Sequence, residues 1–367
     1  MLVLYLSSDY LIGMAIWLVA LGLFITVLLR ARQRAHQKPR RLMVVNAGLS
    51  LGMLLALVTV GELAFACFAD FSDTFSVSNV SKRWLAVHVE GEKNENGFRD
   101  RNELTTFVPG ARKRIIFLGD SFTAGHGIRR MEDRFTDLIA ARFEREQPGK
   151  FVVVNMALPA YDALSVVELA RAELLQKHYE MAACLYVYNL NDVDTFDPHT
   201  AESLKTIQSS EPTFFLFRDT YLLNWLYFRL VAFRNSGAQS YYENLRRSYE
   251  SEPWRRVQNL LTNLHRQCVE QGVDFRMVIF PFVSDVGENY PFRAAHGRIV
   301  DFCKAEKIPV LDLEPAFRPH AGENLVVSRF DAHPNERANA IAAAAIEEQL
   351  LGDFFRPRQS PKNSGRK

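Results

Sequence analysis

The sequence predicts an α/β domain of the flavodoxin-like, doubly wound three-layer type, preceded by a two-helix transmembrane hairpin. Two long apolar stretches without charge open the chain, and five short β-branched and aromatic runs follow them. Helical patterns alternate with these runs. Continuous apolar runs are typical of parallel strands buried on both faces. Their alternation with helices predicts crossovers that cover both sides of one sheet.

The two N-terminal stretches are each long enough to cross a bilayer. No charged residue occurs from Leu11 to Leu29 or from Leu42 to Gly61. Each stretch has about 20 residues, which at ~1.5 Å per residue spans a ~30 Å hydrocarbon core. A cleaved signal peptide fits poorly, because no basic segment precedes Leu11 and cleavage would leave the second stretch unexplained. Glu62 follows the second stretch directly and is expected to be a boundary residue at the interface.

The segment between the two stretches is strongly basic. It carries six cations and no acidic residue: Arg30, Arg32, Arg34, Lys38, Arg40 and Arg41. Short basic loops stay on the cytoplasmic side. We therefore expect a multi-pass protein of the inner (cytoplasmic) membrane with its folded domain outside the cytoplasm, in the periplasm if the source has two membranes. Outside this loop the chain has 38 basic and 42 acidic residues, a balance of −4, which argues against nucleic acid as a partner.

The domain boundaries follow from these segments. We expect two membrane helices at 1–70 with the basic loop at 30–41, a stalk at 71–110, the folded domain at 111–352, and a disordered basic tail at 353–367. The turn-like segment Asn94–Arg99 either docks the stalk beside the first strand or is a plain surface turn. A helical insertion at about 195–250 is rich in aromatic residues. Its rings pack into the body of the domain, cap the active site, or rest on the bilayer.

The alternating elements can be placed along the folded domain. The strands are expected at 114–118, 151–154, 184–188, 276–280 and 310–311, and the helices at 131–146, 165–177, 253–270, 292–306 and 335–351. Ligands bind at the carboxyl ends of the strands in sheets of this kind. Polar residues at those ends are therefore the candidates for a site.

Four polar groups lie where the sheet is expected to form one crevice. They are Gly119-Asp120-Ser121 after the first strand, Asn155 to Tyr161 after the second, Asn189 to Asp192 after the third, and Asp331 to Asn335 at the start of the last helix. Asp-Ser is also a common helix cap. A serine, an asparagine and a histidine gathered in one crevice instead favour nucleophilic catalysis of acyl transfer. An α/β-hydrolase of the usual type is disfavoured, because no Gly-x-Ser-x-Gly surrounds Ser121.

These groups, in this order, resemble the SGNH (GDSL-type) hydrolase superfamily, and more loosely its membrane-anchored extracytoplasmic members, over roughly residues 110–350. The resemblance implies the SGNH hydrolase fold, with Ser121 as nucleophile and His333 as general base oriented by Asp331. It implies an oxyanion hole made by the backbone N–H groups of Ser121 and Ala160 and the side-chain amide of Asn191.

Three positions depart from the family pattern. Ala160 and Asn189 stand where the family has glycine, and Ala160 would be strained if its φ is positive. The family's acid lies three residues before the histidine, where this chain has Phe330. Asp331 is only two residues before His333. Either Asp331 orients the His333 ring from a bent loop, or Asp312 or a backbone carbonyl orients it instead.

The predicted function is a membrane-anchored, extracytoplasmic serine esterase that removes acyl groups, acetyl above all, from an envelope or secreted polysaccharide. One alternative is an O-acyltransferase that uses the same residues and a sugar hydroxyl as acceptor. Another is a non-catalytic member that binds glycan or scaffolds an envelope complex. The expected partners are an ester substrate and the lipid bilayer, and no cofactor or metal is predicted.

The remaining candidates are given structural interpretations. His126 is expected to be an exposed loop histidine rather than part of the site. The acidic cluster after the third strand is expected to be a polar loop rather than a metal site; its members are Asp192, Asp194, Asp197 and His199. The four cysteines form no zinc pattern, and we expect buried free thiols, with a Cys268–Cys303 pair as the alternative.

Overall fold

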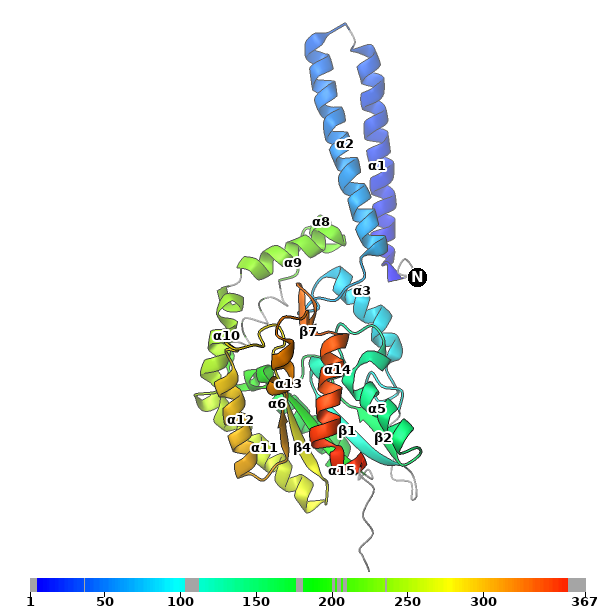
Figure 1. Cartoon of the computed structure of the whole chain (residues 1–367). Helices are drawn as coiled ribbons and strands as arrows, with labels where there is room; N and C mark the ends of the chain where they lie inside the picture. The colour runs from blue at the N-terminus through cyan, green and yellow to red at the C-terminus, as the bar shows by residue number, and fades with distance from the viewer. Residues whose placement is uncertain are drawn as a thin grey trace, which may run out of the picture. The chain divides into compact units, whose positions relative to one another are not determined.

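The computed structural model describes residues 5–35, 37–102, 112–175, 181–199, 202, 206, 210–234 and 236–355. The chain divides into two compact units, which we call the hairpin unit (Met1–Val87 with Thr206–Asn235) and the sheet unit (His88–Lys205 with Ser236–Lys367) (Figure 1). The expected insertion at 195–250 is thus shared between the two units. Residues 353–355 of the expected tail belong to the short helix α15 (Gly352–Phe355), and 356–367 lie outside the described residues.

The sheet unit contains five parallel strands in the order β2-β1-β3-β4-β5. They are β1 (Lys113–Gly119), β2 (Phe151–Asn155), β3 (Met181–Asn189), β4 (Phe275–Phe280) and β5 (Val310–Asp312). In β1, which lies between β2 and β3, Ile116 is opposite Val154 of β2 on one side and Cys184 of β3 on the other. Every residue of β4 is buried, as expected of a strand covered on both faces. The doubly wound fold class predicted from the sequence is confirmed.

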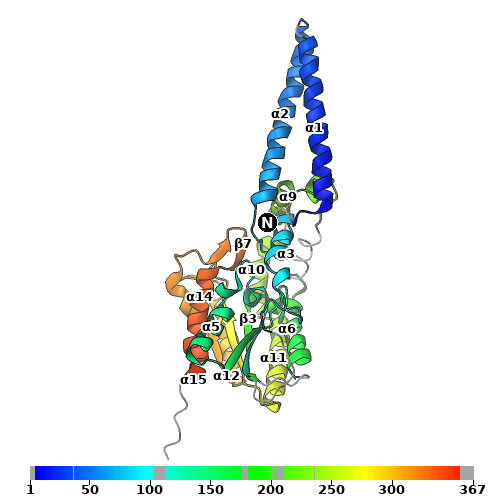
Figure 2. The same cartoon turned by 90° about the vertical axis from the view of Figure 1, so that its right-hand side faces the viewer.

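Helices cover both faces of the sheet, which gives three layers (Figures 1 and 2). On one face α5 (Phe135–Glu146) contacts α14 (Glu336–Ala345), and on the other α6 (Ala163–Leu169) contacts α11 (Glu252–Glu270). Beside α11 lies α12 (Arg293–Ala305), where the rings of Trp254 and Phe302 meet at 5.7 Å between centroids. Further helices of this unit are α4 (Ser121–Ala124), α10 (Ser236–Ser248) and α13 (Glu314–Phe317).

A two-stranded antiparallel hairpin lies beside the main sheet. It consists of β6 (Val326–Ser328) and β7 (Asp331–Pro334), and Ser328 is paired with Asp331 across the turn. The sequence analysis expects no strand in the segment that β7 occupies, and it begins the following helix at Asn335. The helix begins later, at Glu336, because the Asn335 side chain accepts a hydrogen bond from the backbone N–H of Ala338 and caps it there.

The hairpin unit contains the two apolar helices, α1 (Ser8–Arg34) and α2 (Pro39–Phe68). They pack closely, because a Cβ on Gly48 would lie 3.1 Å from the Leu28 side chain and one on Gly52 would lie 3.2 Å from Ile25. Small residues four apart on one helix allow this close approach. The Trp17 indole donates to the Thr59 hydroxyl at 2.8 Å. Most other side chains of the two helices are exposed.

Three further helices complete the hairpin unit: α3 (Asn79–His88), α8 (Phe215–Arg218) and α9 (Leu222–Arg234). The segment expected to be a stalk therefore contains a regular helix, α3, which ends at the unit boundary. The Asn79 backbone N–H donates to the Asn224 side chain at 2.8 Å, which ties α3 to α9. The Arg83 guanidinium lies 4.5 Å from the centroid of the Tyr221 ring.

Candidate active site

Ser121 lies at the carboxyl end of β1, where the chain turns sharply into α4. The Asp120 carboxylate accepts the backbone N–H of Phe122 at 2.9 Å and caps this short helix. The turn requires glycine at 119, because a Cβ there would lie 2.3 Å from the Thr123 hydroxyl. Ser121 is partly exposed, so its hydroxyl is open to a ligand.

Ser121, His333 and Asp331 form a continuous hydrogen-bonded line. The Ser121 Oγ lies 2.8 Å from His333 Nε2. The His333 Nδ1 lies 2.6 Å from Asp331 Oδ1, which also accepts the backbone N–H of His333 at 3.1 Å. Asp331 is fully buried and His333 is nearly so. The imidazole therefore has a hydroxyl on one nitrogen and a carboxylate on the other, an arrangement suited to moving a proton.

The two-residue spacing between Asp331 and His333 follows from the strand that carries them. In extended backbone, residues i and i+2 point to the same side of the strand. The side chains of Asp331 and His333 in β7 therefore face the same way, and Ala332 between them is exposed. An acid three residues before the histidine would suit a helical turn instead. The structure thus brings together the two residues that the sequence places at an unusual spacing.

Asp312, the alternative acid, lies in a different pair. Its Oδ1 is 2.7 Å from Nδ1 of His296, and it accepts the backbone N–H of Glu314 at 2.9 Å. His296 in turn has its Nε2 3.2 Å from the Tyr290 hydroxyl. The structure does not bring Asp312 to His333.

His126 is buried beside the triad, so the expectation of an exposed loop histidine is wrong. Only 4% of its surface is exposed, and its ring lies 4.3 Å from the His333 ring between centroids. Its Nε2 is 3.6 Å from Asp331 Oδ2, the oxygen that does not bond His333 Nδ1. Its backbone N–H donates to the Ser121 carbonyl at 2.9 Å. The two flanking glycines have φ of 76° and 83°, which turns the chain back towards Asp331.

The residues assigned to the oxyanion hole follow the neighbouring strands. Ala160, in the loop after β2, has φ of 64°, a left-handed conformation that costs ~1 kcal/mol or more for a residue with a Cβ. Asn191 is in the 3₁₀ turn η5 (Leu190–Phe196) that directly follows β3. Its side-chain Oδ1 is buried and has no hydrogen-bond partner in the described part of the chain.

Asn155 ties the loop after β2 to the nucleophile turn, a role that the sequence did not indicate. Its Nδ2 donates to the Thr123 carbonyl at 2.7 Å and to the Thr136 hydroxyl at 3.0 Å. Its Oδ1 accepts the Ala157 N–H at 3.1 Å. A buried asparagine with all its groups paired fixes the relative positions of the segments it joins.

Asn189, which stands where the family has glycine, holds the residue before the nucleophile. Its Nδ2 donates to Asp120 Oδ2 at 3.2 Å, and its Oδ1 accepts the Leu190 N–H at 2.7 Å. Burial raises the pKa of Asp120 to about 6, against the opposing effects of the Phe122 N–H, a charged His333 and the Asn189 amide. Asn189 therefore supplies one of the few donors to a buried carboxyl next to Ser121.

The acids of the polar segment that follows β3 are buried rather than exposed to solvent. The Asp192 Oδ2 accepts the Tyr186 hydroxyl at 2.7 Å. The Asp194 carboxylate accepts the Tyr241 hydroxyl at 3.0 Å, and Asp197 accepts the Ser248 hydroxyl at 2.6 Å. Burial, and then the charge of Asp120, raise the pKa of Asp192 well above its ordinary value. Asp194 and Asp197 thus fasten α10 to the segment that follows β3.

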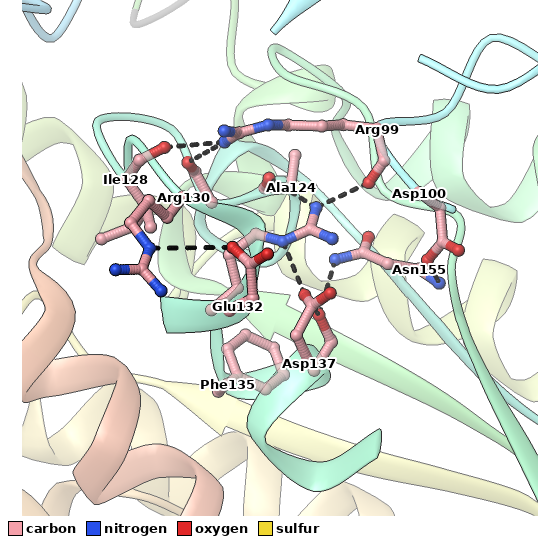
Figure 3. Close-up of polar contacts among 12 residues, drawn as sticks. Arg99, Asp100, Ala124, Ile128, Arg130, Glu132, Phe135, Asp137 and Asn155 are labelled. Carbon is pink, nitrogen blue, oxygen red and sulfur yellow. Dashed lines mark hydrogen bonds and ion pairs between the residues drawn. The ribbon is translucent and has the colours of Figure 1, made fainter. Parts of the chain in front are cut away.

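A buried arginine holds the loop that follows the nucleophile (Figure 3). The Nη1 of Arg99 donates to the carbonyl oxygens of Gly125 and Ile128 at 3.1 and 2.8 Å, and its Nη2 donates to that of Arg129 at 3.0 Å. Burial lowers the pKa of Arg99, and its hydrogen bond to Glu92 opposes this shift. In the sequence, Arg99 is only the last residue of a predicted turn. In the structure, its guanidinium holds the loop that carries His126 through three hydrogen bonds, which we call the Arg99 clamp.

A second arginine, which the sequence analysis did not single out, lies beneath the same loop. Arg134 is fully buried; its Nη1 donates to the carbonyl of Arg99 at 2.6 Å and to that of Ala124 at 3.2 Å. Its Nε donates to Asp137 at 2.8 Å. Next to Arg99, the Asp100 carboxylate accepts the Asn155 backbone N–H at 2.7 Å, which ties this part of the chain to the end of β2 (Figure 3).

One group among the described residues lies close enough to hold a metal ion. The ligand atoms of His126, Asp331 and His333 all lie within 4.8 Å of one another. Asp331 and His333 are already bonded to each other, and His333 is bonded to Ser121. Two of the three possible metal ligands, Asp331 and His333, are thus already used in the hydrogen bonds that lead to Ser121. The four cysteines are free thiols, and Cys184, Cys268 and Cys303 are buried.

Comparisons with known proteins give similarity at the level of structure only. No protein-family model matches the chain, and no curated protein matches its sequence. Among solved structures, the acetyl xylan esterase AlAXEase is 13% identical, with a TM-score of 0.42 over 65% of this chain and 99% of that one. The esterase EstA from Pseudoalteromonas sp. is 14% identical, with a TM-score of 0.41 over 66% and 100%. A lipolytic G-D-S-L family protein from Veillonella parvula is 12% identical, with a TM-score of 0.39 over 65% and 98%.

Proposed function

We propose that this chain is an SGNH-type serine esterase, anchored in a membrane by α1 and α2, with Ser121 as its nucleophile. The observation that carries the proposal is the line from Ser121 Oγ to His333 Nε2, at 2.8 Å, and from His333 Nδ1 to Asp331 Oδ1, at 2.6 Å. A serine hydroxyl is a weak nucleophile until a neighbouring base takes its proton. These three residues supply the nucleophile, the base and the carboxylate that orients the base.

The reaction follows from this geometry. As Ser121 Oγ attacks the ester carbonyl carbon, His333 Nε2 takes the hydroxyl proton. The buried carboxylate of Asp331 at Nδ1 stabilises the imidazolium that forms. His333 then gives the proton to the oxygen of the leaving alcohol, and the acyl group stays on Ser121. A water molecule, deprotonated by His333, attacks this acyl-enzyme and releases the carboxylic acid and the free serine.

The tetrahedral intermediate carries a negative oxygen that needs fixed donors. We assign them to the backbone N–H groups of Ser121 and Ala160 and to the Asn191 side chain. Loss of one such donor typically lowers kcat by ~10²–10³. The left-handed backbone at Ala160, with φ of 64°, supports this assignment, because strained conformations persist where the surrounding structure fixes a functional group.

The two apolar helices support the membrane anchor. Only 6% of the apolar window of α1 and 22% of that of α2 is buried, so neither is a core helix of a soluble domain. A signal sequence accounts for one such helix but not for a close-packed pair. The basic residues of the loop, from Arg30 to Arg41, favour its retention in the cytoplasm. We therefore assign the sheet unit to the extracytoplasmic side of the inner membrane.

We assign short acyl esters as the substrate class, acetyl esters of an envelope or secreted polysaccharide above all. The extracytoplasmic location and the resemblance to SGNH hydrolases support this choice. The partly exposed Ser121 admits an ester carried on a larger molecule.

The test is activity-based labelling of membranes that carry the wild type or Ser121→Ala. A fluorophosphonate probe is expected to label the wild type and not the variant, with parallel loss of turnover of a short-chain aryl ester. The proposal fails if the folded wild type neither labels nor hydrolyses ester, or if the variant behaves identically. Product analysis with an acyl donor and a sugar acceptor then distinguishes hydrolysis from transfer, because transfer yields an acylated sugar.

A further inference from the structure

Helices α8 and α9 present an apolar face that the described residues of the hairpin unit leave exposed. Five large side chains on it are exposed by 37 to 56%: Phe214, Phe215, Phe217, Leu226 and Leu230. The ring of Phe214 contacts those of Phe215 and Phe217, at 4.9 and 5.9 Å between centroids. Contiguous exposed apolar patches on folded chains mark interaction surfaces.

The opposite face of α9 is firmly packed, so this exposure is not that of a loose helix. Tyr221 and Phe228 are buried, and Tyr221 meets the ring of Tyr10 at 5.0 Å. The ring centroid of Trp225 lies 5.6 Å from that of Phe65 in α2. Inward residues at 221, 225 and 228 and outward ones at 226 and 230 have helical spacing. Both sides of α9 therefore carry apolar side chains, and the described residues of the hairpin unit cover only one of them.

Glu62 sets the position of α9 along α2. Its Oε1 accepts the backbone N–H of Tyr221 at 2.6 Å and its Oε2 accepts that of Leu222 at 2.9 Å, at the start of α9. A carboxylate stabilises a helix at this end. Glu62 directly follows the uncharged stretch Leu42–Gly61, whose ~30 Å length matches the hydrocarbon core. The beginning of α9 is thereby fixed at the outer boundary of that core.

We infer that the exposed face of α8 and α9 lies in the interface of the same bilayer that α1 and α2 cross. The lipid surface is the one partner that is continuous with the exposed sides of those helices. Figure 1 shows α9 running across the foot of the hairpin rather than along it, as expected of a helix that lies in the interface. The inference rests on the proposed membrane crossing of α1 and α2, and it gives Glu62 the role of a positioning residue for α9.

The test uses the full chain in phospholipid nanodiscs, with single spin labels in a Cys67→Ser background. Labels at Phe215→Cys and Leu226→Cys report on the proposed surface, Leu57→Cys reports on α2, and Arg255→Cys on α11 is the aqueous control. Collision with oxygen, which dissolves in lipid, is compared with collision with a water-soluble nickel chelate. We expect oxygen to be favoured at 57, 215 and 226 and the nickel chelate at 255.

The outcomes separate this inference from the proposed anchor. If oxygen is favoured at 57 but the nickel chelate at 215 and 226, α1 and α2 cross the bilayer and the interfacial role is overturned. If the nickel chelate is favoured at 57 as well, the anchor itself fails and the inference fails with it. In a Glu62→Gln background, we expect the label at 226 to collide more often with the nickel chelate relative to oxygen. The collision preference of the label at 57 is expected to stay unchanged. If the collision preference of the label at 226 is unchanged, Glu62 does not position α9.

Discussion

Asp331 and Asp312 each hold a buried histidine, and only the histidine held by Asp331 contacts a serine. Asp331 bonds His333, which reaches Ser121, whereas Asp312 bonds His296, which reaches the Tyr290 hydroxyl. We therefore expect Asp331→Asn to lower kcat by about 10³-fold, because the amide neither fixes the required tautomer nor stabilises the imidazolium. Asp312→Asn is expected to stay within about tenfold of the wild type. Turnover of an aryl ester by both variants, with folding checked by circular dichroism, measures the difference. Equal losses would contradict the assignment of the acid.

His126 offers a second prediction at the scale of one residue. It faces the oxygen of Asp331 that does not bond Nδ1 of His333, and its ring packs on the ring of His333. We expect His126→Phe to lower kcat about tenfold with little change in KM, because a contact to the Asp331 carboxylate is lost while the ring volume is kept.

The matched variant for this site is His126→Gln. Its amide places an N–H near the position of the histidine Nε2, so it is expected to recover most of the lost kcat. Steady-state kinetics give kcat and KM of both variants, and their melting temperatures show whether a loss of activity follows a loss of stability. If both lose activity in proportion to a loss of stability, His126 serves packing alone.

The site residues that the sequence named share one property. Ser121, Asn191 and His333 are in short motifs whose order along the chain is itself informative. Asn155 and Arg134 are equally enclosed in the site, but their roles depend on burial and on carbonyl groups far away in the sequence. No local pattern encodes such contacts. His126 was misplaced for the same reason, since a histidine between two glycines looks like a surface loop until Asp331 is placed beside it.

At the scale of elements, the loop between α4 and α5 is held by the guanidinium groups of Arg99 and Arg134 rather than by regular structure. Arg99 bonds three carbonyl groups of this loop. We expect Arg99→Met to destabilise the protein by about 3 kcal/mol and to slow fluorophosphonate labelling of Ser121, because three carbonyl groups of the loop, two of them in buried residues, each lose a charged donor.

Arg101→Met is the matched control for this prediction. Arg101 is two residues away, its side chain is 58% exposed, and it pairs on the surface with Glu132, which is 47% exposed. An exposed pair contributes ~0–1 kcal/mol, so labelling and stability are expected to be unchanged. Denaturant unfolding in detergent and labelling time courses compare the two variants. Equal effects of both would mean that the clamp is unimportant.

The five parallel strands could be predicted from the sequence because each is a continuous apolar run, and runs of this kind are covered on both faces in one type of sheet only. The hairpin of β6 and β7 could not be predicted. Its strands are three and four residues long, and β7 has the sequence Asp-Ala-His-Pro, which carries no apolar alternation. Such a strand is specified by its pairing partner and by the side chains it presents to the site.

At the scale of the whole molecule, the basic loop predicts the orientation in the membrane. We expect Gln37→Cys in this loop to resist an impermeant maleimide in spheroplasts until the membrane is permeabilised, because loops of this charge remain in the cytoplasm. Arg255→Cys in the sheet unit is expected to react before permeabilisation. Both are made in a Cys67→Ser background, since the other three cysteines are buried. The opposite labelling order would place the site in the cytoplasm and exclude an envelope polysaccharide as substrate.

The division into units shows what a linear sequence conceals at this scale. The segment Thr206–Asn235 belongs with the N-terminal helices, more than a hundred residues away in the chain, and the following residues belong with the sheet. The aromatic composition of the insertion indicated that it packs on something. Its partners could not be predicted, because the Glu62 carboxylate that fixes α9 sits in what looks like the end of a membrane span.

The pairing of Asp331 and His333 on one strand has a consequence for how this chain can vary. Because the two residues share a face with one exposed residue between them, almost any side chain at position 332 is compatible with the pair. A single inserted or deleted residue is not, since it turns one partner to the opposite side. The pair therefore tolerates point substitution between its members but no change of length. A sequence pattern that requires the acid three residues before the histidine therefore misses chains in which a strand carries the two residues at a two-residue spacing.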